Sequence, residues 1–201
     1  MTDLFRAKAP KVMADLMRDF DLSVEDAAAI LGNLAHECNG FRTLQETKPT
    51  VAGSRGGWGW AQWTGPRRRQ FEAWCLRKAY SPSSDVANYS FLYRELKGLE
   101  GEPSLKAVKA TKAASGLRAK VIAFELAFLR AGIKHYDSRT EWALRAMKAW
   151  TDNKVPPPPD VEPVDGKPQA SPALKLLIGG VVTALAALAA YLGIDLKGMI
   201  P

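Results

Sequence analysis

The sequence predicts a mainly α-helical domain with one small β-hairpin, followed by a linker and a single C-terminal membrane-spanning helix. Three observations predict this fold class. Apolar residues recur at helical spacing through most of residues 1–154, strand-like alternation occurs only near residues 58–63, and a long apolar stretch follows a proline-rich segment. The length of 201 residues allows one compact domain plus an appendage. We therefore expect a folded domain at 1–154, a linker at 155–173 and a membrane helix at 174–196.

The first two helices have the clearest patterns. Residues 5–20 place apolar side chains at three- and four-residue steps, which is typical of one buried helix face. Ser23 is expected to cap the second helix, with Asp26 as its partner three residues later. Gly40 is a stop signal. Glu37 is therefore expected in the last turn of this helix or just beyond it.

Between Asn39 and Gly65, glycine and tryptophan replace the helical pattern, which predicts a loop with the short hairpin. Another helix then opens at Thr64, Gly65 and Pro66, because proline is favoured in a first helical turn. Three more helices are expected in residues 82–99, 116–132 and 138–150. For the last of these, Ser138 and Glu141 form a predicted capping box.

The C-terminal part has two segments of contrasting composition. Residues 155–173 are rich in proline, which favours an extended polyproline II spacer. Leu176–Ile194 carries no charge, and a helix of its length rises about 28 Å, close to the roughly 30 Å of a bilayer core. The alternative is an alanine-rich core helix that packs back on the domain. Residues 1–10 lack the apolar region of a signal peptide, and the charges around the apolar segment do not predict its orientation.

The charge of the chain is uneven. The net charge is +7, and from residue 156 onward three lysines stand against four acids, so the cationic excess lies in the predicted domain. A basic surface attracts polyanions, which include nucleic acid, anionic lipid and bacterial wall polymers. The run from Lys106 to Lys120 would be the footprint of a non-catalytic binding protein, although such runs also form the solvated face of an ordinary helix.

Cysteine and histidine limit the enzyme classes. Cys38 and Cys75 are too few for a disulfide scaffold and lack CxxC spacing, and they are either joined in one disulfide or free. His36 and His135 are the only histidines, without the ligand spacing of a zinc amidase or endopeptidase. A cysteine peptidase needs a cationic site that the sequence does not show. We predict no metal and no cofactor.

Glu37 is the acid with the most distinctive surroundings. It ends an apolar helix and precedes a tryptophan-rich loop, and both the helix macrodipole and apolar surroundings disfavour a charged carboxylate. A carboxyl group held neutral can protonate a glycosidic oxygen. From spacing alone, a solvated glutamate at a helix end is the simpler interpretation.

Four segments in a fixed order carry a family resemblance. They are GNLAHECNGF from Gly32, LQET from Leu44, GGWGWAQWTGPRRRQFEAWC from Gly56 and ANYSFLYREL from Ala87. Together they resemble the phage tail lysozyme family over roughly residues 27–132. The resemblance implies a lysozyme-like α+β fold, a catalytic role for Glu37 and the glycan of bacterial peptidoglycan as substrate. Relatives commonly have serine where this chain has Cys38.

The resemblance also assigns a substrate cleft to the loop opposite Glu37. It implies that this cleft is lined by Trp58, Trp60, Gln62, Trp63 and Thr64. Aromatic rings and amides suit the apolar faces and hydroxyl edges of sugars. We expect at least one of the three tryptophans to belong to the core instead, and Trp74, at helical spacing from Phe71, to be a core residue.

The second catalytic group is less defined. Glu46 is the only acid between Cys38 and Gln70, so either Glu46 acts as base or electrostatic partner, or Gln62 and Thr64 hold a water. A lytic transglycosylase would need only Glu37, acting first as acid and then as base.

The three arginines from Arg67 to Arg69 either bind carboxylates of muramyl peptides or form a solvated turn, and we assign them no catalytic part.

These predictions describe a phage endolysin that binds no nucleic acid. It would be anchored in the host inner membrane, would act on peptidoglycan in the periplasm, and would lyse the host cell as an antimicrobial enzyme. A virion-borne tail lysin is the alternative, although a membrane span would be unusual there.

Overall fold

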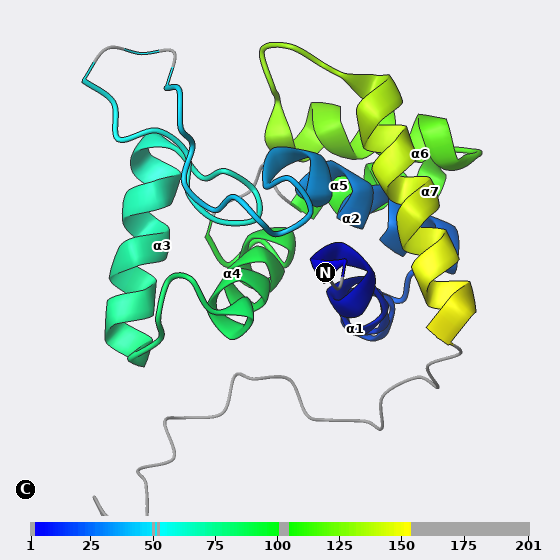
Figure 1. The fold of residues 1–201 in the computed structure, drawn as a ribbon, viewed down its shortest axis with the longest axis horizontal. Helices are drawn as coiled ribbons and strands as arrows, with labels where there is room; N and C mark the ends of the chain where they lie inside the picture. The colour runs from blue at the N-terminus through cyan, green and yellow to red at the C-terminus, as the bar shows by residue number, and fades with distance from the viewer. Residues whose placement is uncertain (1–2, 50, 52, 101–104, 154–201) are drawn as a thin grey trace, which may run out of the picture. The chain divides into compact units, whose positions relative to one another are not determined.

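The described part of the chain is mainly α-helical, as predicted (Figure 1). The computed structural model describes residues 3–49, 51, 53–100 and 105–153. Its helices are α1 (Leu4–Phe20), α2 (Val24–Glu37), α3 (Gly65–Lys78), α4 (Asp85–Leu96), α5 (Leu105–Ala113), α6 (Leu117–Phe124) and α7 (Tyr136–Asn153), with a π-helical turn η2 (Glu125–Leu129) continuing α6. The predicted linker and the apolar segment 176–194 lie outside the described residues. Among the helices that the structure describes, none is both long and apolar enough to span a membrane.

Helix α2 is the central element, and it packs against α7, α6 and α1. Every residue from Asp26 to Ala35 is buried, although the apolar stripe of a surface helix covers only one face. Its N-terminus is fixed as predicted, because the Ser23 hydroxyl accepts from the Asp26 N–H and the Asp26 carboxylate accepts from the Ser23 N–H. The apolar face predicted for residues 5–20 is also buried, in α1.

Helices α2 and α7 approach each other closely at Gly32. A Cβ atom added there would meet the Ala143 Cβ at 2.6 Å and the Arg139 carbonyl oxygen at 2.7 Å. Real carbon contacts lie near 3.5–4.0 Å, so only glycine fits this crossing. The crossing brings the first turns of α7 beside the last turns of α2, where Glu37 lies.

The predicted β-hairpin is not formed, since the described residues contain only two isolated antiparallel bridges, Gln45–Trp58 and Trp58–Trp63. Trp58 is shared by both bridges, and neither bridge extends into a ladder. The chain also turns back at once, because Gly59 and Gln62 have φ values of 80° and 47°. The segment is therefore a folded loop.

The start of α7 also differs from the prediction. The helix begins at Tyr136, two residues before Ser138, so the predicted Ser138–Glu141 capping box does not exist. Ser138 instead lies within the helix, and its hydroxyl contacts the Nδ1 atom of His36 at 2.9 Å. The local capping signal was misleading because the side chain serves a contact across two helices.

Candidate active site

Glu37 is the last residue of α2, as predicted. The helix ends in a Schellman-type turn, in which the Gly40 N–H donates to the Ala35 carbonyl at 2.8 Å and Asn39 takes the left-handed conformation with a φ of 48°. The stop signal therefore involves Asn39 as well as Gly40. The Glu37 side chain is 19% exposed, so its carboxyl is ordered by the domain and accessible to a ligand.

A buried arginine holds the Glu37 carboxyl. The Arg139 Nη2 atom lies 2.7 Å from Glu37 Oε1, and the Arg139 side chain is 1% exposed. The Arg139 Nε donates to the Lys134 carbonyl at 2.7 Å, and Nη1 lies 3.4 Å from Asn33 Oδ1. The apolar surroundings expected for Glu37 therefore include a buried cation that the sequence did not predict. The carboxyl is part of a charged network that joins α2 to α7.

His36 also connects the end of α2 to the start of α7. Its ring lies 5.4 Å from the His135 ring, and its Nδ1 contacts the Ser138 hydroxyl. Burial, with the charges of Arg139 and His135, lowers the pKa of His36 to about 4. His36 is therefore neutral near pH 7 and connects α2 to α7 as a hydrogen-bonding group.

Both cysteines are free and buried. The Cys38 thiol donates to the Leu34 carbonyl at 3.1 Å. Burial raises the pKa of Cys38 to about 12 and that of Cys75 to about 11. Since the thiolate is the nucleophilic form, these values oppose a cysteine peptidase.

Two of the predicted catalytic side chains order the loop that follows α2. The Gln62 amide nitrogen donates to the carbonyls of Leu44 and Gly59, each at 3.0 Å. The Glu46 Oε2 accepts from the Gly57 N–H at 2.7 Å. Each side chain is thus held in a defined place within the loop by backbone groups. Their catalytic roles remain predictions.

The predicted tryptophans divide into core and surface. Trp60 and Trp63 are 1% and 0% exposed, so neither presents a face to a sugar in this structure. The Trp63 Nε1 donates to Glu95 at 2.6 Å. Trp58 is half-buried and Thr64 is exposed. The expectation that at least one tryptophan belongs to the core is confirmed, and Trp74 is also buried as predicted.

The arginines that follow the loop mostly stabilise the fold. Arg67 binds Glu95 through Nε and Nη2, each at 2.8 Å. Arg68 is buried and donates to the Gly56 carbonyl at 2.9 Å. Neither a solvated turn nor a ligand site describes these two side chains, and only Arg69 of the three is exposed.

The basic run from Lys106 to Lys120 does not form one continuous face. Helix α5 ends at Ala113 and α6 begins at Leu117. Lys120 is 7% exposed and its Nζ pairs with Asp26 at 2.6 Å. These residues therefore do not form the continuous basic face that a polyanion-binding protein would be expected to have.

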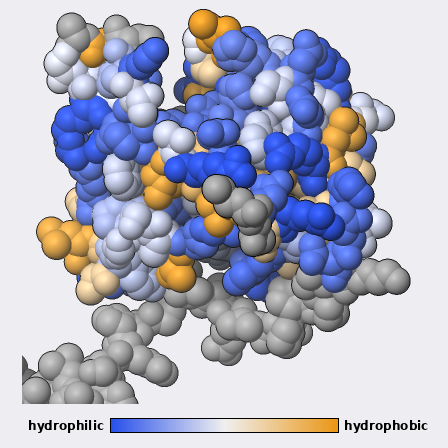
Figure 2. Space-filling model, viewed as in Figure 1, coloured by the Kyte–Doolittle hydropathy of each residue, from blue (hydrophilic) through white to orange (hydrophobic). Residues whose placement is uncertain are grey.

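The surface is hollowed near the end of α2. In the space-filling view, a notch separates the lobe that carries residues 45–49 and 53–57 from the lobe that carries the connection between η2 and α7 (Figure 2). In the ribbon view, α2 ends between these two lobes (Figure 1). Aromatic contacts join the chain after Glu37 to the loop, since the rings of Phe41 and Trp60 lie 4.8 Å apart.

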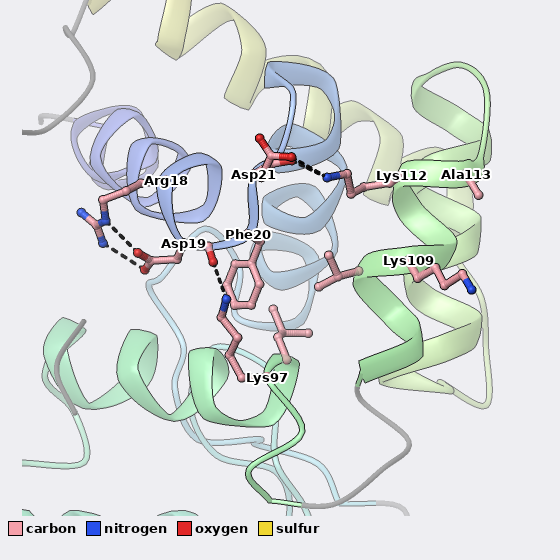
Figure 3. A pocket seen from close by; sticks show the side chains of 10 residues that line it. Arg18, Asp19, Phe20, Asp21, Lys97, Lys109, Lys112 and Ala113 are labelled. Atoms are coloured by element: carbon pink, nitrogen blue, oxygen red, sulfur yellow. Dashed lines mark hydrogen bonds and ion pairs between the residues drawn. The ribbon is translucent and has the colours of Figure 1, made fainter. Parts of the chain in front are cut away.

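A separate hollow of about 750 Å³ lies far from Glu37 (Figure 3). It is lined by residues 18–21 at the α1 end, by Leu96 and Lys97, and by Val108, Lys109, Lys112 and Ala113 of α5. It adjoins the start of α2, about 20 Å along the helix from Glu37. Two of its lysines cap the C-terminal end of α1: Lys97 donates to the Asp19 carbonyl and Lys112 donates to the Asp21 carbonyl. We therefore place the candidate chemistry at Glu37.

Sequence reasoning missed Arg139, whose contact with Glu37 spans 102 residues of sequence. One signal was present. Arg139 lies at helical spacing from Ala143 and Ala146, on the buried stripe of α7. A cation on such a stripe requires a buried acidic or carbonyl partner. In the described part of the chain, no group of three His, Cys, Asp or Glu side chains could hold a metal ion.

Comparison with known proteins identifies the family of the chain. A family model described as phage tail lysozyme matches residues 7–150, which include all the described helices apart from the ends of α1 and α7. No curated protein and no solved structure is significantly similar to the chain. The family model covers well over half of the 201 residues. The chain therefore belongs to the phage tail lysozyme family.

Proposed function

We propose that the protein is a phage endolysin that cleaves the glycan backbone of bacterial peptidoglycan, with Glu37 as the general acid. One observation supports this assignment above the others: the Glu37 carboxyl is partly exposed at the end of α2 and is held in place by a buried arginine. Family membership supports lysozyme chemistry, and the notch beside α2 is compatible with a polymeric substrate.

The proposed first step is proton transfer to the glycosidic oxygen. Arg139 contacts Oε1 of Glu37, which leaves Oε2 to carry the proton. The proton moves from Oε2 to the leaving oxygen as the C1–O bond breaks, and positive charge develops at the sugar carbon. Glu37 is left as a carboxylate.

Two routes complete a hydrolytic reaction. Glu46 could act as base or electrostatic partner, since its carboxylate is ordered by the Gly57 N–H. Alternatively, polar groups such as Gln62 and Thr64 hold the attacking water. Water then adds to the sugar carbon and gives up its proton, which produces a reducing end.

A lytic transglycosylase is the second candidate. It is favoured by the position of the Glu37 carboxyl, which a buried arginine holds across two helices, because this reaction needs only one carboxyl group. In this reaction the Glu37 carboxylate takes back a proton from a sugar hydroxyl, which closes a 1,6-anhydro ring without water.

We propose that Trp58 and Thr64 contact the glycan, whereas Trp60 and Trp63 support the loop from beneath. Trp58 is half-buried and its Nε1 donates to the Pro82 carbonyl at 3.3 Å, so the ring is fixed and partly accessible. A fixed aromatic face suits the apolar side of a sugar ring.

The location is a further proposal. We propose that residues 176–194 attach the protein to the host inner membrane, with the domain acting in the periplasm at the reach of the proline-rich linker. Co-sedimentation of the full chain with lipid vesicles tests this attachment, and a chain ending at residue 173 should stay in solution.

The decisive experiment digests purified peptidoglycan with the full chain and with Glu37→Gln, followed by mass spectrometry of the released muropeptides. Reducing ends that are lost in the variant support a lysozyme, and anhydro ends that are lost support a transglycosylase. Equal release by both proteins contradicts the role of Glu37. A non-catalytic wall-binding protein would release nothing and would tolerate Glu37→Gln in a binding assay.

A further inference from the structure

We propose that Arg139 is a positioning residue that fixes the Glu37 carboxyl for proton transfer, and that the buried carboxylate of Glu125 fixes Arg139 in turn. The inference rests on the proposed function, because it assigns a task to the surroundings of Glu37. It goes further in naming two residues, from the second half of the chain, on which the reaction would depend.

The Arg139 guanidinium is constrained through all of its nitrogen atoms. Nη2 contacts Glu37 Oε1 at 2.7 Å, Nε donates to the Lys134 carbonyl at 2.7 Å, and Nη1 lies 3.4 Å from Asn33 Oδ1 and 3.5 Å from the Asn33 carbonyl. Asn33 is itself fixed, because its amide donates to the carbonyls of Ala29 and Val121 at 3.0 Å. A rigid planar fork held in this way determines where Oε1 lies.

Glu125 anchors the segment that supplies one of these acceptors. Its side chain is 0% exposed and lies at the start of the π-helical turn η2. Oε1 accepts from the Ala131 N–H at 2.7 Å and from Lys134 Nζ at 3.2 Å, while Oε2 accepts from the Tyr136 hydroxyl at 3.1 Å. Lys134 therefore connects the two sites, since its side chain binds Glu125 and its carbonyl binds Arg139.

The arrangement fits the charge change of the reaction. When Glu37 gives up its proton, its carboxylate becomes negative beside a cation that is already in place, so no solvent needs to reorganise. The same cation would stabilise the carboxylate until it acts as a base. Arg139 contacts Glu37 and not the glycan in this scheme, so its effect passes through the orientation and charge of Glu37.

The other titratable groups around Glu37 allow this effect to be isolated. His36 and Cys38 flank Glu37 on the chain, and their pKa values are about 4 and about 12, so neither changes charge between roughly pH 6 and 9. His135 also lies close to this junction, on the connection before α7, with its ring 5.4 Å from that of His36. The substitution His135→Asn is therefore the matched control.

The experiment uses the full chain with Arg139→Lys, Arg139→Met and Glu125→Gln, each alone and combined with Glu37→Gln. Rates of cleavage of soluble glycan strands are measured against substrate concentration from pH 5 to 9, with Tm for each protein. We expect Arg139→Met to lower kcat about 100-fold with little change in KM, Glu125→Gln to lower it about 10-fold, and Arg139→Lys to recover part of the loss.

The pH profile and the double variants separate positioning from a general structural role. Arg139→Met should change the pH profile of cleavage and His135→Asn should not, because Arg139 contacts the Glu37 carboxyl directly. In the Glu37→Gln background, Arg139→Met should cause no further loss, because residues that act as a unit are not additive. An equal further loss in that background overturns the inference.

The conservative variant Arg139→Lys keeps the experiment decisive if Arg139→Met does not fold. If Arg139→Met has no cooperative thermal transition, Arg139→Lys decides: a lower kcat at wild-type Tm supports the inference, and a wild-type kcat overturns it. If Glu37→Gln cleaves as fast as the wild type, the proposed function itself fails. If Glu37→Gln is inactive while both Arg139 variants keep full kcat, only the inference fails.

Discussion

The crossing of α2 and α7 at Gly32 gives the most direct test of the architecture that carries the site. In Gly32→Ala, the new Cβ would lie 2.6 Å from the Cβ and N atoms of Ala143 and 2.7 Å from the Arg139 carbonyl. Two of these three neighbours are backbone atoms, which cannot rotate away. The helices must separate by about 1 Å to restore ordinary carbon contacts. Alanine is otherwise the better helix former, by about 1 kcal/mol, so any destabilisation comes from the clash.

We expect Gly32→Ala to destabilise the domain by about 1–3 kcal/mol, the usual range for overpacking. In a domain of this size, that loss lowers Tm by roughly 3–12 °C. The separation also shifts the start of α7, so glycan cleavage should fall together with Tm. The matched control is Gly132→Ala, because a Cβ at Gly132 meets no atom within 4 Å. Both proteins are compared by thermal circular dichroism and by peptidoglycan digestion. A Gly32→Ala Tm equal to that of the control would refute the close crossing.

Four further substitutions test the fold and the site. Lys120→Met leaves the Asp26 carboxylate buried without its cation and should cost about 3–5 kcal/mol in chemical denaturation; a loss below about 1 kcal/mol would show that the pair is solvated. Between pH 6.5 and pH 4 the wild-type Tm should fall, because the pKa of His36 in the folded protein is about 4 and the unfolded chain takes up the proton first as pH falls. In His36→Asn this fall in Tm should be smaller. An unchanged Tm profile would contradict this expectation. Trp63→Ala should destabilise the protein by about 3–5 kcal/mol, whereas Trp58→Ala should mainly raise KM for glycan strands, and the reverse pattern would contradict the division of these tryptophans.

Local signals predicted the elements whose contacts are local. The capping box at Ser23 and Asp26 joins residues three apart, so the sequence contains both partners side by side. The end of α2 is similar, because Asn39 and Gly40 close the turn over the residues just before them. The position of Glu37 at a helix end therefore follows from the residues on either side of it.

Signals with two physical explanations were misleading. Ser138 matches a capping residue, yet its hydroxyl is used by His36 from another helix. Trp60 and Trp63 match sugar-binding platforms, yet an aromatic side chain that suits a sugar face also suits an apolar core. The alternation near Trp58 matches a hairpin, yet the positive φ values at Gly59 and Gln62 turn the chain before a ladder forms. In the first two cases the side chain suits either environment, and the partner that decides between them lies elsewhere in the chain.

The environment of Glu37 shows why the acid could be predicted and its electrostatic surroundings could not. The dipole of α2 is a property of one helix, so it follows from the local sequence. The charge of Arg139 reaches Glu37 only because Gly32 allows α7 to pack closely and because Glu125 fixes the Lys134 segment that binds the guanidinium. A lone arginine among alanines on a buried helix stripe is itself evidence for an acidic or carbonyl partner elsewhere in the chain.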